Sequence, residues 1–166
     1  MIKGFDMDGT LIAYEQGYVP NHDLNYHLID QVVNPGDKIA ILTNQGGIPL
    51  GYRTDEQFAD RFLAVRHYLE VGCRAKVVEL QVALWHEKAT RLQITNAALD
   101  LMGIYYVRND MRYLIWPQPD YRKPQPRMLE IANVGIYYGD SDEDEQAAAA
   151  AGVQFVRVPR FMGGES

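Results

Sequence analysis

Short apolar runs alternate with longer segments of helical periodicity along most of the 166-residue sequence. Each run is long enough for one buried strand, and a helix between successive strands is typical of α/β domains with a parallel sheet. The pattern predicts a Rossmann-like, doubly wound and mostly parallel sheet. Its strands are expected to include residues 2–6, 39–43, 135–138 and 153–157.

The length of the chain suggests one domain, and no repeat or long linker divides it. We therefore predict a single domain over residues 1–160, followed by a loose tail at residues 161–166. The middle of the chain is less regular and leaves open a small insertion around residues 76–118. Within it, residues 76–84 fit either a strand or the start of a helix, and the aromatic residues 104–108 suggest an extended segment.

The net charge and the cysteine content exclude several classes of protein. A formal charge of −6 and an isoelectric point of about 5.1 argue against a protein that coats nucleic acid, although a local basic patch is compatible with them. Because Cys73 is the single cysteine, an internal disulfide and a cysteine-rich zinc site are excluded. The sequence has neither an apolar stretch of about 18 residues nor the apolar core of a signal peptide. We expect a cytoplasmic protein without membrane association.

Two carboxylates stand two residues apart where the first predicted strand ends, in the sequence DMDGT. In an extended chain, Asp6 and Asp8 point to the same side. One carboxylate could attack a substrate while the other moves protons, and Gly9 allows a sharp turn directly after them. Taken alone, the motif also fits an aspartate-rich turn that caps a helix.

Two further segments carry groups that suit a phosphate. Thr43 and Asn44 follow the second buried strand, where a hydroxyl and free backbone N–H groups can bind phosphate oxygens. Arg122 and Lys123 precede a proline, and a lysine can neutralise a phosphate as a point charge. Each segment taken alone also fits an ordinary loop or a solvated surface charge.

An acidic run, GDSDED, follows the strand predicted at residues 135–138. Its carboxylates repel one another unless a cation lies among them, and a hard divalent cation is the natural partner. Asp140 is expected to face such a site, whereas Asp142 and Glu143 are better explained as charges at a helix N-terminus. Because parallel strands end at one edge of the sheet, the acidic run, DMDGT and the Thr43 segment should converge there.

The four segments together resemble the haloacid dehalogenase-like (HAD) phosphatase superfamily. DMDGT, LTN, a lysine before proline and GDSDED match its four motifs in order, and the resemblance spans Asp6 to about Gly152. It implies an HAD-like fold and a phosphoric monoester hydrolase that uses Mg²⁺ and an aspartyl-phosphate intermediate. Hydrolases of phosphate esters need the second aspartate, and the presence of Asp8 favours a phosphatase over a dehalogenase.

The same resemblance implies a role for each matching residue. Asp6 would attack phosphorus, and Asp8 would protonate the leaving oxygen and later activate water. Mg²⁺ would be held by the Asp6 and Asp140 carboxylates and by the Asp8 backbone carbonyl. Asp144 would belong to the metal site by orienting Lys123 or a metal-bound water. Thr43 and the Asn44 N–H would bind the phosphoryl oxygens and Lys123 would neutralise them, so that Thr43 and Lys123 also act in catalysis. Arg122 would be a further substrate-binding residue.

Substrate choice in this superfamily usually depends on a cap domain, and this chain has no room for a large one. An open, small-cap site admits a bulky substrate. The segments TNQGGIPLG and YRKPQPRML resemble the 3′-phosphatase half of polynucleotide kinase-phosphatases and equally the histidinol-phosphate and heptose-bisphosphate phosphatases. The latter usually carry a Cys/His zinc loop before the RKP motif, which this sequence lacks. The expected substrate is therefore a nucleic-acid 3′-phosphate end, with a sugar or amino-alcohol phosphate as the alternative.

Other interpretations stay open at this point. A non-catalytic binding module on an HAD scaffold and a phosphotransferase are two of them, and the oligomeric state is not indicated. The aromatic residues between the second and third motifs could form a stacking platform for bases, or they could be half-buried strand residues. They are Tyr105, Tyr106, Tyr113 and Trp116, interleaved with Arg108 and Arg112.

Overall fold

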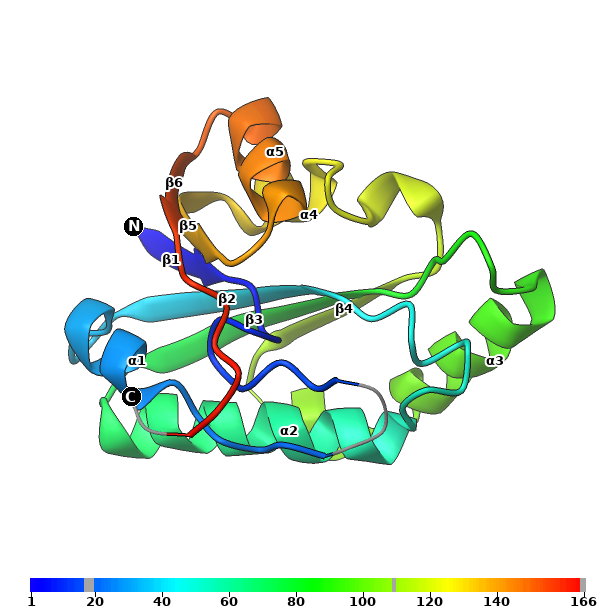
Figure 1. Ribbon diagram of the computed structural model, residues 1–166, viewed down its shortest axis with the longest axis horizontal. Coiled ribbons are helices and arrows are strands. Elements are labelled where there is room, and N and C mark those ends of the chain that lie inside the picture. The colour runs from blue at the N-terminus through cyan, green and yellow to red at the C-terminus, as the bar shows by residue number, and fades with distance from the viewer. Residues whose placement is uncertain (17–19, 109, 165–166) are drawn as a thin grey trace.

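The computed structural model describes residues 1–16, 20–108 and 110–164. These residues form a six-stranded sheet in which all paired strands are parallel, in the order β4-β3-β2-β1-β5-β6 (Figure 1). The strands are β1 Ile2–Phe5, β2 Lys38–Asn44, β3 Lys76–Ala83, β4 Arg112–Trp116, β5 Val134–Gly139 and β6 Gln154–Arg157. The predicted α/β fold is confirmed, and each of the four expected strands ends within one residue of its predicted bounds.

Helices cover both faces of the sheet (Figure 1). On one face lie α1 Tyr26–Val32, α2 Asp55–His67 and α3 Arg91–Met102, and on the other lie α4 Arg127–Ala132 and α5 Asp142–Ala151. The chain adds strands outward from β1 to β4 and then returns to place β5 on the other side of β1. Because crossovers between parallel strands are right-handed, this reversal moves the helices to the opposite face. The ends of β1 and β5 therefore form the switch point where ligands bind in open α/β sheets.

Three helices begin with a capping box, in which the N-cap side chain and the side chain three residues later each accept a backbone N–H of the other. The pairs are Thr54 with Gln57, Thr90 with Gln93, and Ser141 with Asp144. The pair at α5 fixes Asp144, which bears on the site. Among the helices of the described residues, none is both long and apolar enough to span a lipid bilayer.

The middle of the chain is part of the central sheet. Residues 76–83 form β3 between β2 and β4, so of the two predictions for this stretch the strand is right and the helix start is wrong. The region 76–118, which the sequence left open as an insertion, thus contributes both β3 and β4. Tyr105–Arg108 forms a 3₁₀ turn, and the extended segment expected there is wrong. This turn lies in the connection between α3 and β4, where the buried Ile104 and Val107 pack against the core.

The two aromatic residues of β4, Tyr113 and Trp116, do not form a joint stacking platform. The Tyr113 hydroxyl donates to the Leu101 carbonyl oxygen at 3.2 Å, on the face that carries α3. Trp116 stacks on Tyr121 at 3.9 Å between ring centroids and packs with the core of the opposite face. Residues three apart on a strand point to opposite faces, so one base cannot contact both. The platform interpretation is therefore wrong for Tyr113 and Trp116, which are half-buried strand aromatics. Tyr105 and Tyr106 are exposed and lie in the 3₁₀ turn.

The C-terminal residues are tied to the loop that follows β1. The Phe161 N–H donates to the Gly9 carbonyl oxygen at 2.8 Å, and the Tyr14 N–H donates to the Phe161 carbonyl oxygen at 2.9 Å. The Gly164 N–H donates to Asp23 Oδ2 at 2.9 Å. The expectation of a loose tail is therefore wrong for residues 161–164, because backbone pairing with this loop holds them; residues 165–166 lie outside the described residues.

Candidate active site

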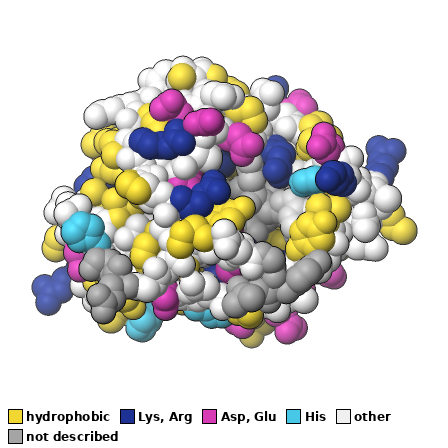
Figure 2. Space-filling model, viewed as in Figure 1, with side chains coloured by type: hydrophobic (Ala, Val, Ile, Leu, Met, Phe, Trp, Pro, Cys, Tyr) yellow, Lys and Arg dark blue, Asp and Glu magenta, His cyan; other side chains and the backbone are white. Residues whose placement is uncertain are grey.

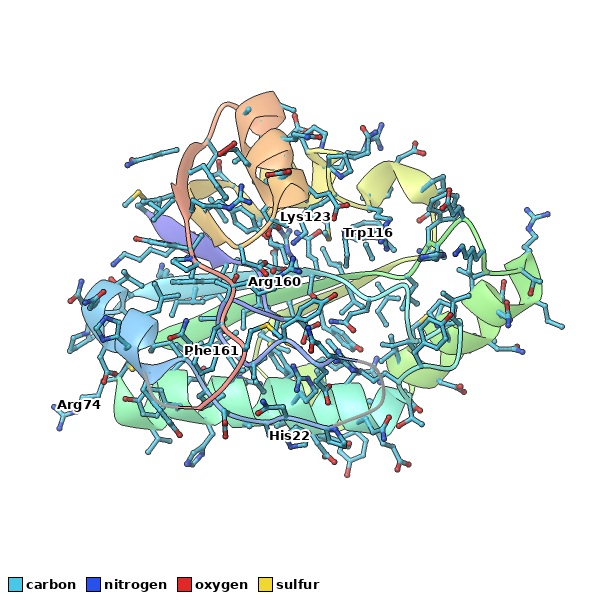
Figure 3. The ribbon with its side chains drawn as sticks, in the orientation of Figure 1. His22, Arg74, Trp116, Lys123, Arg160 and Phe161 are labelled. Carbon is cyan, nitrogen blue, oxygen red and sulfur yellow. The ribbon has the colours of Figure 1, made fainter. Side chains whose placement is uncertain are left out.

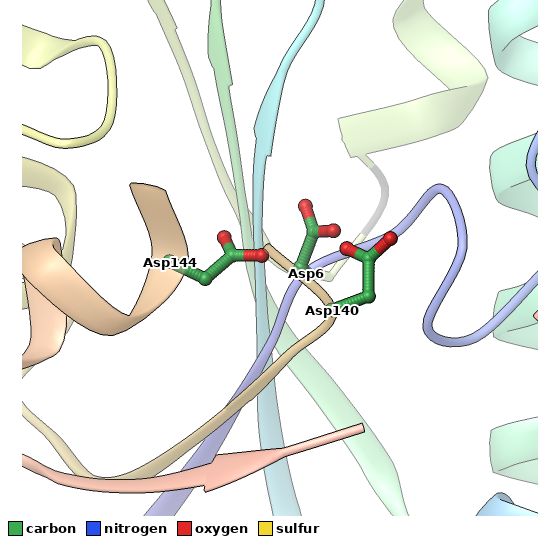
Figure 4. A group of neighbouring side chains, drawn as sticks. All are labelled: Asp6, Asp140 and Asp144. Carbon is green, nitrogen blue, oxygen red and sulfur yellow. The ribbon is translucent and has the colours of Figure 1, made fainter. Parts of the chain in front are cut away.

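Three aspartates from two strand ends and one helix converge at the carboxyl edge of the sheet (Figure 4). Asp6 follows β1, Asp140 follows β5, and Asp144 lies in the first turn of α5. One carboxylate oxygen of each lies within 4.8 Å of the others, and all three residues are buried. The Asp6 N–H donates to the Tyr138 carbonyl oxygen at 2.9 Å, which joins the two strand ends. The predicted convergence of the first and fourth motifs is thus present in the structure.

The Lys123 ammonium lies among these carboxylates and is almost fully buried. It donates to Asp6 Oδ1 at 2.9 Å and to Asp144 Oδ1 at 2.7 Å. Its nitrogen also lies 2.9 Å from the Leu42 carbonyl oxygen and 2.8 Å from the Tyr137 hydroxyl. A buried ammonium needs such partners to offset its lost hydration. Lys123 therefore joins the ends of β1 and β2 to α5.

Burial and neighbouring charges set the protonation of this cluster. Burial raises the pKa of the Asp6 carboxyl well above its usual range, and Asp144 and Asp140 add to the rise although Lys123 opposes it. Burial alone would also raise the pKa of Asp144, but Lys123 and the hydrogen bonds from Ser141 lower it. For Lys123, burial would lower the pKa, but Asp144 and Asp6 raise it well above its usual value. Asp144 and Lys123 therefore form an ion pair in which both groups are charged, whereas the contact of Asp6 with the same lysine does not offset its burial.

This set of groups fits a hard divalent cation. Carboxylate oxygens are the ligands that Mg²⁺ prefers among protein side chains, and the three aspartates offer them in one small volume. Burial is the main reason that the pKa of Asp6 is raised, and the Asp144 and Asp140 carboxylates add to the rise; a bound cation would favour the ionised form against both. The site is therefore compatible with the divalent metal that the sequence resemblance implies.

Thr43 and Asn44 lie beside the cluster at the end of β2, and both already have protein partners. Asn44 Nδ2 donates to the Lys123 carbonyl oxygen at 3.0 Å, and Asn44 Oδ1 accepts the Lys123 N–H at 3.0 Å. The Asn44 side chain thus holds the backbone of the lysine. The buried Thr43 hydroxyl accepts from Gln45 Nε2 at 2.9 Å. The contacts of Thr43 and Asn44 with a phosphoryl group stay predictions.

The Asp8 carboxylate belongs to a neighbouring arginine network. Its Oδ1 accepts from Arg61 Nη2 at 2.6 Å, and its Oδ2 accepts from Gln45 Nε2 at 2.7 Å and from Arg53 Nη1 at 3.2 Å. Glu15 pairs with both arginines, so two carboxylates face two guanidinium groups. Burial alone would raise the pKa of Asp8, but Arg53 and Arg61 lower it below its usual value. Asp8 is therefore a carboxylate in this arrangement.

The arginine network was missed by the sequence analysis, although one signal for it exists. Arg61 is fully buried and lies on the side of α2 that carries apolar residues. Charged side chains are almost never fully buried without partners, so an arginine inside an apolar helical stripe predicts buried acidic partners. The apolar residues of this stripe are Phe58, Phe62 and Val65. Arg53 and Tyr137 carried no comparable signal, because a loop arginine and a strand tyrosine are common without any such role.

A cleft of about 910 Å³ opens on the Asp8 side of the cluster. Arg122 lines it and donates to the Trp85 carbonyl oxygen at 3.0 Å. Burial lowers the pKa of Arg122. Within the described residues Arg122 forms no ion pair, so its positive charge is available to a ligand. Other residues of the lining are Asp8, Asn44, Gly46, Arg53, Arg61 and His86.

A family model described as polynucleotide kinase 3 phosphatase matches residues 1–145, a range that contains Asp6, Lys123 and Asp140. The chain belongs to the polynucleotide kinase 3 phosphatase family. As a member of that family it is a hydrolase of the phosphatase class, which confirms the reaction class that the motifs implied.

The fold of this family member is shared with a solved structure. A protein from Mesorhizobium loti, classed among the HAD-like phosphatases, superposes with a TM-score of 0.60 over 96% of this chain and 76% of that chain. The two sequences are 21% identical, so the likeness shows the fold alone. It confirms the HAD-like fold predicted from the four motifs. No curated protein matches the sequence significantly.

Proposed function

We propose that this phosphatase hydrolyses phosphomonoesters through an aspartyl phosphate formed on Asp6, with Mg²⁺ as its cofactor. The observation that carries the proposal is the setting of Asp6, which is buried at a strand end beside two other carboxylates and bound to Lys123. A carboxylate fixed in this way can attack phosphorus in line, and fixed positive charge can stabilise the phosphoryl oxygens. The order of the motifs and the family membership support the same assignment.

In the first step, a carboxylate oxygen of Asp6 bonds to phosphorus while the bond from phosphorus to the leaving oxygen breaks. Asp8 donates a proton to that oxygen. In the second step, water attacks phosphorus and gives a proton to Asp8, and the bond to Asp6 breaks to release phosphate. Arg53 and Arg61 keep Asp8 ionised in the structure, so they oppose the proton uptake that must precede the first step.

The remaining residues supply position and charge. Bound Mg²⁺ would add positive charge at the phosphoryl oxygens, and the Asp6 and Asp140 carboxylates with the Asp8 backbone carbonyl would hold it. Lys123 would neutralise the phosphoryl group, and its hydrogen bond to Asp144 keeps the lysine in place. Thr43 and the Asn44 N–H would bind phosphoryl oxygens.

Removal of divalent cations should abolish hydrolysis of p-nitrophenyl phosphate, because the buried carboxylates of Asp6 and Asp140 would have no bound cation to offset their charge. Mg²⁺ should restore activity, and Ca²⁺ should inhibit, since its longer bonds of about 2.3–2.6 Å and larger coordination number can draw Asp6 into a bidentate pose. Initial rates after EDTA dialysis and re-addition of each ion measure this. Full activity in the dialysed enzyme would contradict the metal requirement.

We further propose that the substrate is a nucleic-acid strand with a 3′-phosphate. The family description names this kind of substrate, and the cleft supports it. Because Asp8 protonates the leaving oxygen and lines the cleft, the leaving group should lie there, where Arg122 can meet a neighbouring phosphate. On the face shown in Figure 2, basic and acidic side chains are interspersed. Among the described residues of that face, the Lys and Arg side chains form no broad basic patch. Binding should therefore be short and directed to the strand end.

At matched salt, a 3′-phosphorylated oligonucleotide should be hydrolysed with a higher kcat/KM than p-nitrophenyl phosphate or a 5′-phosphorylated oligonucleotide. Arg122→Gln should lower kcat/KM for the oligonucleotide about tenfold, the usual scale for one lost charged contact, and should change p-nitrophenyl phosphate hydrolysis little. The control is Arg74→Gln, an exposed arginine remote from the site (Figure 3). Faster hydrolysis of sugar or amino-alcohol phosphates than of the oligonucleotide would favour the metabolite alternative.

A further inference from the structure

Residues 158–164, here called the C-terminal strap, run from the end of β6 past the loop that follows β1 (Figures 1 and 3). At the start of the strap, the Val158 N–H donates a hydrogen bond to the Gly139 carbonyl oxygen at 2.8 Å. Further along, the Phe161 backbone forms hydrogen bonds with the backbone of Gly9 and Tyr14. It is therefore fastened to both segments that carry the aspartates of the site. The family match ends at residue 145, so the strap lies beyond it.

The strap places one side chain against the aspartate cluster. Arg160 Nε donates to Asp140 Oδ2 at 2.7 Å, and the guanidinium carbon lies 4.4 Å from the centroid of the Tyr14 ring. The Asp140 side chain is only 3% exposed, whereas the Arg160 side chain is 44% exposed. A cation from the surface thus reaches a buried carboxylate, and stacking on Tyr14 holds it there.

The oxygen that Arg160 binds lies in a crowded corner. A Cβ added to Gly9 would come within 2.3 Å of Asp140 Oδ2 and 3.3 Å of the Arg160 side chain, so only glycine fits between the first motif and this ion pair. Gly9 directly follows Asp8, whose backbone carbonyl belongs to the proposed cation site. Arg160 therefore brings its charge to the edge of the space that a divalent cation would fill.

We propose that Arg160 sets the cation affinity of the site by competing for Asp140. In the metal-free protein its guanidinium neutralises Asp140, and a divalent cation has to displace it or share the carboxylate with it. The inference rests on the proposed cation site. It adds to the site a residue that lies beyond the range of the family match. In this proposal the C-terminal strap keeps the affinity for the divalent cation low until substrate phosphate adds negative charge. Charge favours this direction, because removal of a guanidinium leaves the cluster more negative.

Isothermal titration calorimetry of Mg²⁺ binding tests the proposal without substrate. Arg160→Gln should bind Mg²⁺ roughly three- to tenfold more tightly than wild type, the scale expected for one partly exposed ion pair. Arg160→Lys keeps the charge and should stay near the wild-type affinity. The matched control is Arg157→Gln, which removes an equally exposed arginine that pairs with Asp142 at 3.0 Å. It should leave the affinity unchanged.

Thermal unfolding gives a second readout. In Arg160→Gln, Asp140 loses its partner in the metal-free protein, so the rise in Tm caused by Mg²⁺ should be larger than in wild type. Equal or weaker Mg²⁺ binding by Arg160→Gln would overturn the competition proposal while leaving the cation site intact. Absence of measurable Mg²⁺ binding in wild type and in Arg160→Gln alike would overturn the cation site itself, and the role of Arg160 with it.

Discussion

The Asp6→Asn variant should hydrolyse p-nitrophenyl phosphate at least about 10³-fold more slowly than the wild-type chain, as expected when a nucleophile is removed. The amide that replaces the carboxylate is a poor nucleophile for phosphorus, but it has nearly the same shape. Its oxygen can still accept the hydrogen bond that Lys123 donates to Asp6 Oδ1 at 2.9 Å. The measurement is kcat at saturating Mg²⁺.

The stability of the same variant separates loss of chemistry from loss of fold. Because burial raises the pKa of Asp6, its ionised form is less favourable in the folded than in the unfolded chain at neutral pH. A neutral side chain removes that penalty, so Asp6→Asn should melt at the wild-type Tm or above it. The matched control is Asp142→Asn, whose carboxylate is 81% exposed and pairs with Arg157, and it should keep nearly full activity. Turnover near wild type in Asp6→Asn would mean that another residue attacks phosphorus.

The sequence predicted those site residues that directly follow a strand. Asp6 and Asp140 each follow an apolar run that could be recognised as a strand, and parallel strands end at one edge of a sheet. Their convergence therefore follows from the order of elements alone. Asp144 was assigned to the site by the family resemblance alone, and the structure places it in the first turn of α5, where the capping box with Ser141 fixes it.

The part that the sequence did not predict depends on side chains that meet across loops. Arg61 reaches Asp8 from α2, and Arg53 reaches it from the loop before α2. Nothing in the local pattern fixes which loop faces which helix, so these partners need the tertiary structure. Arg160 was hidden for a related reason: its contact with Asp140 depends on the path of the residues that follow it, which were expected to be loose, whereas backbone hydrogen bonds from Phe161 to the Gly9 loop order them.

Lys123→Met should be the most destabilising of the substitutions considered, with a loss of about 3–5 kcal/mol in the free energy of unfolding, as when one partner of a buried ion pair is removed. Methionine has a similar volume, so the loss would come from charge. Asp144 would remain buried with only neutral partners, Ser141 and, at 3.4 Å, the Tyr137 hydroxyl, and Asp6 would lose its ion pair with Lys123. Urea unfolding at pH 7 measures the change. The control is Lys3→Met, which breaks a pair with Asp37 whose side chains are 16% and 21% exposed, and it should cost less, about 1 kcal/mol.

The dependence on pH tests whether this loss is electrostatic. In wild type, Lys123 and Ser141 lower the pKa of Asp144 against the effect of burial, so the pair adds stability above the usual aspartate pKa of 3.8, and that stability is lost as the pH falls below it. In Lys123→Met, burial without the cation should raise the pKa of Asp144, and that of Asp6 should rise further. Protonation then relieves the buried charges, so the difference between variant and wild type should shrink from pH 7 to about pH 4.5. The double variant Lys123→Met with Asp144→Asn should recover part of the stability at pH 7, since it removes one uncompensated charge. A difference that stays constant with pH and is not reduced in the double variant would show that Lys123 stabilises the fold by packing instead of charge.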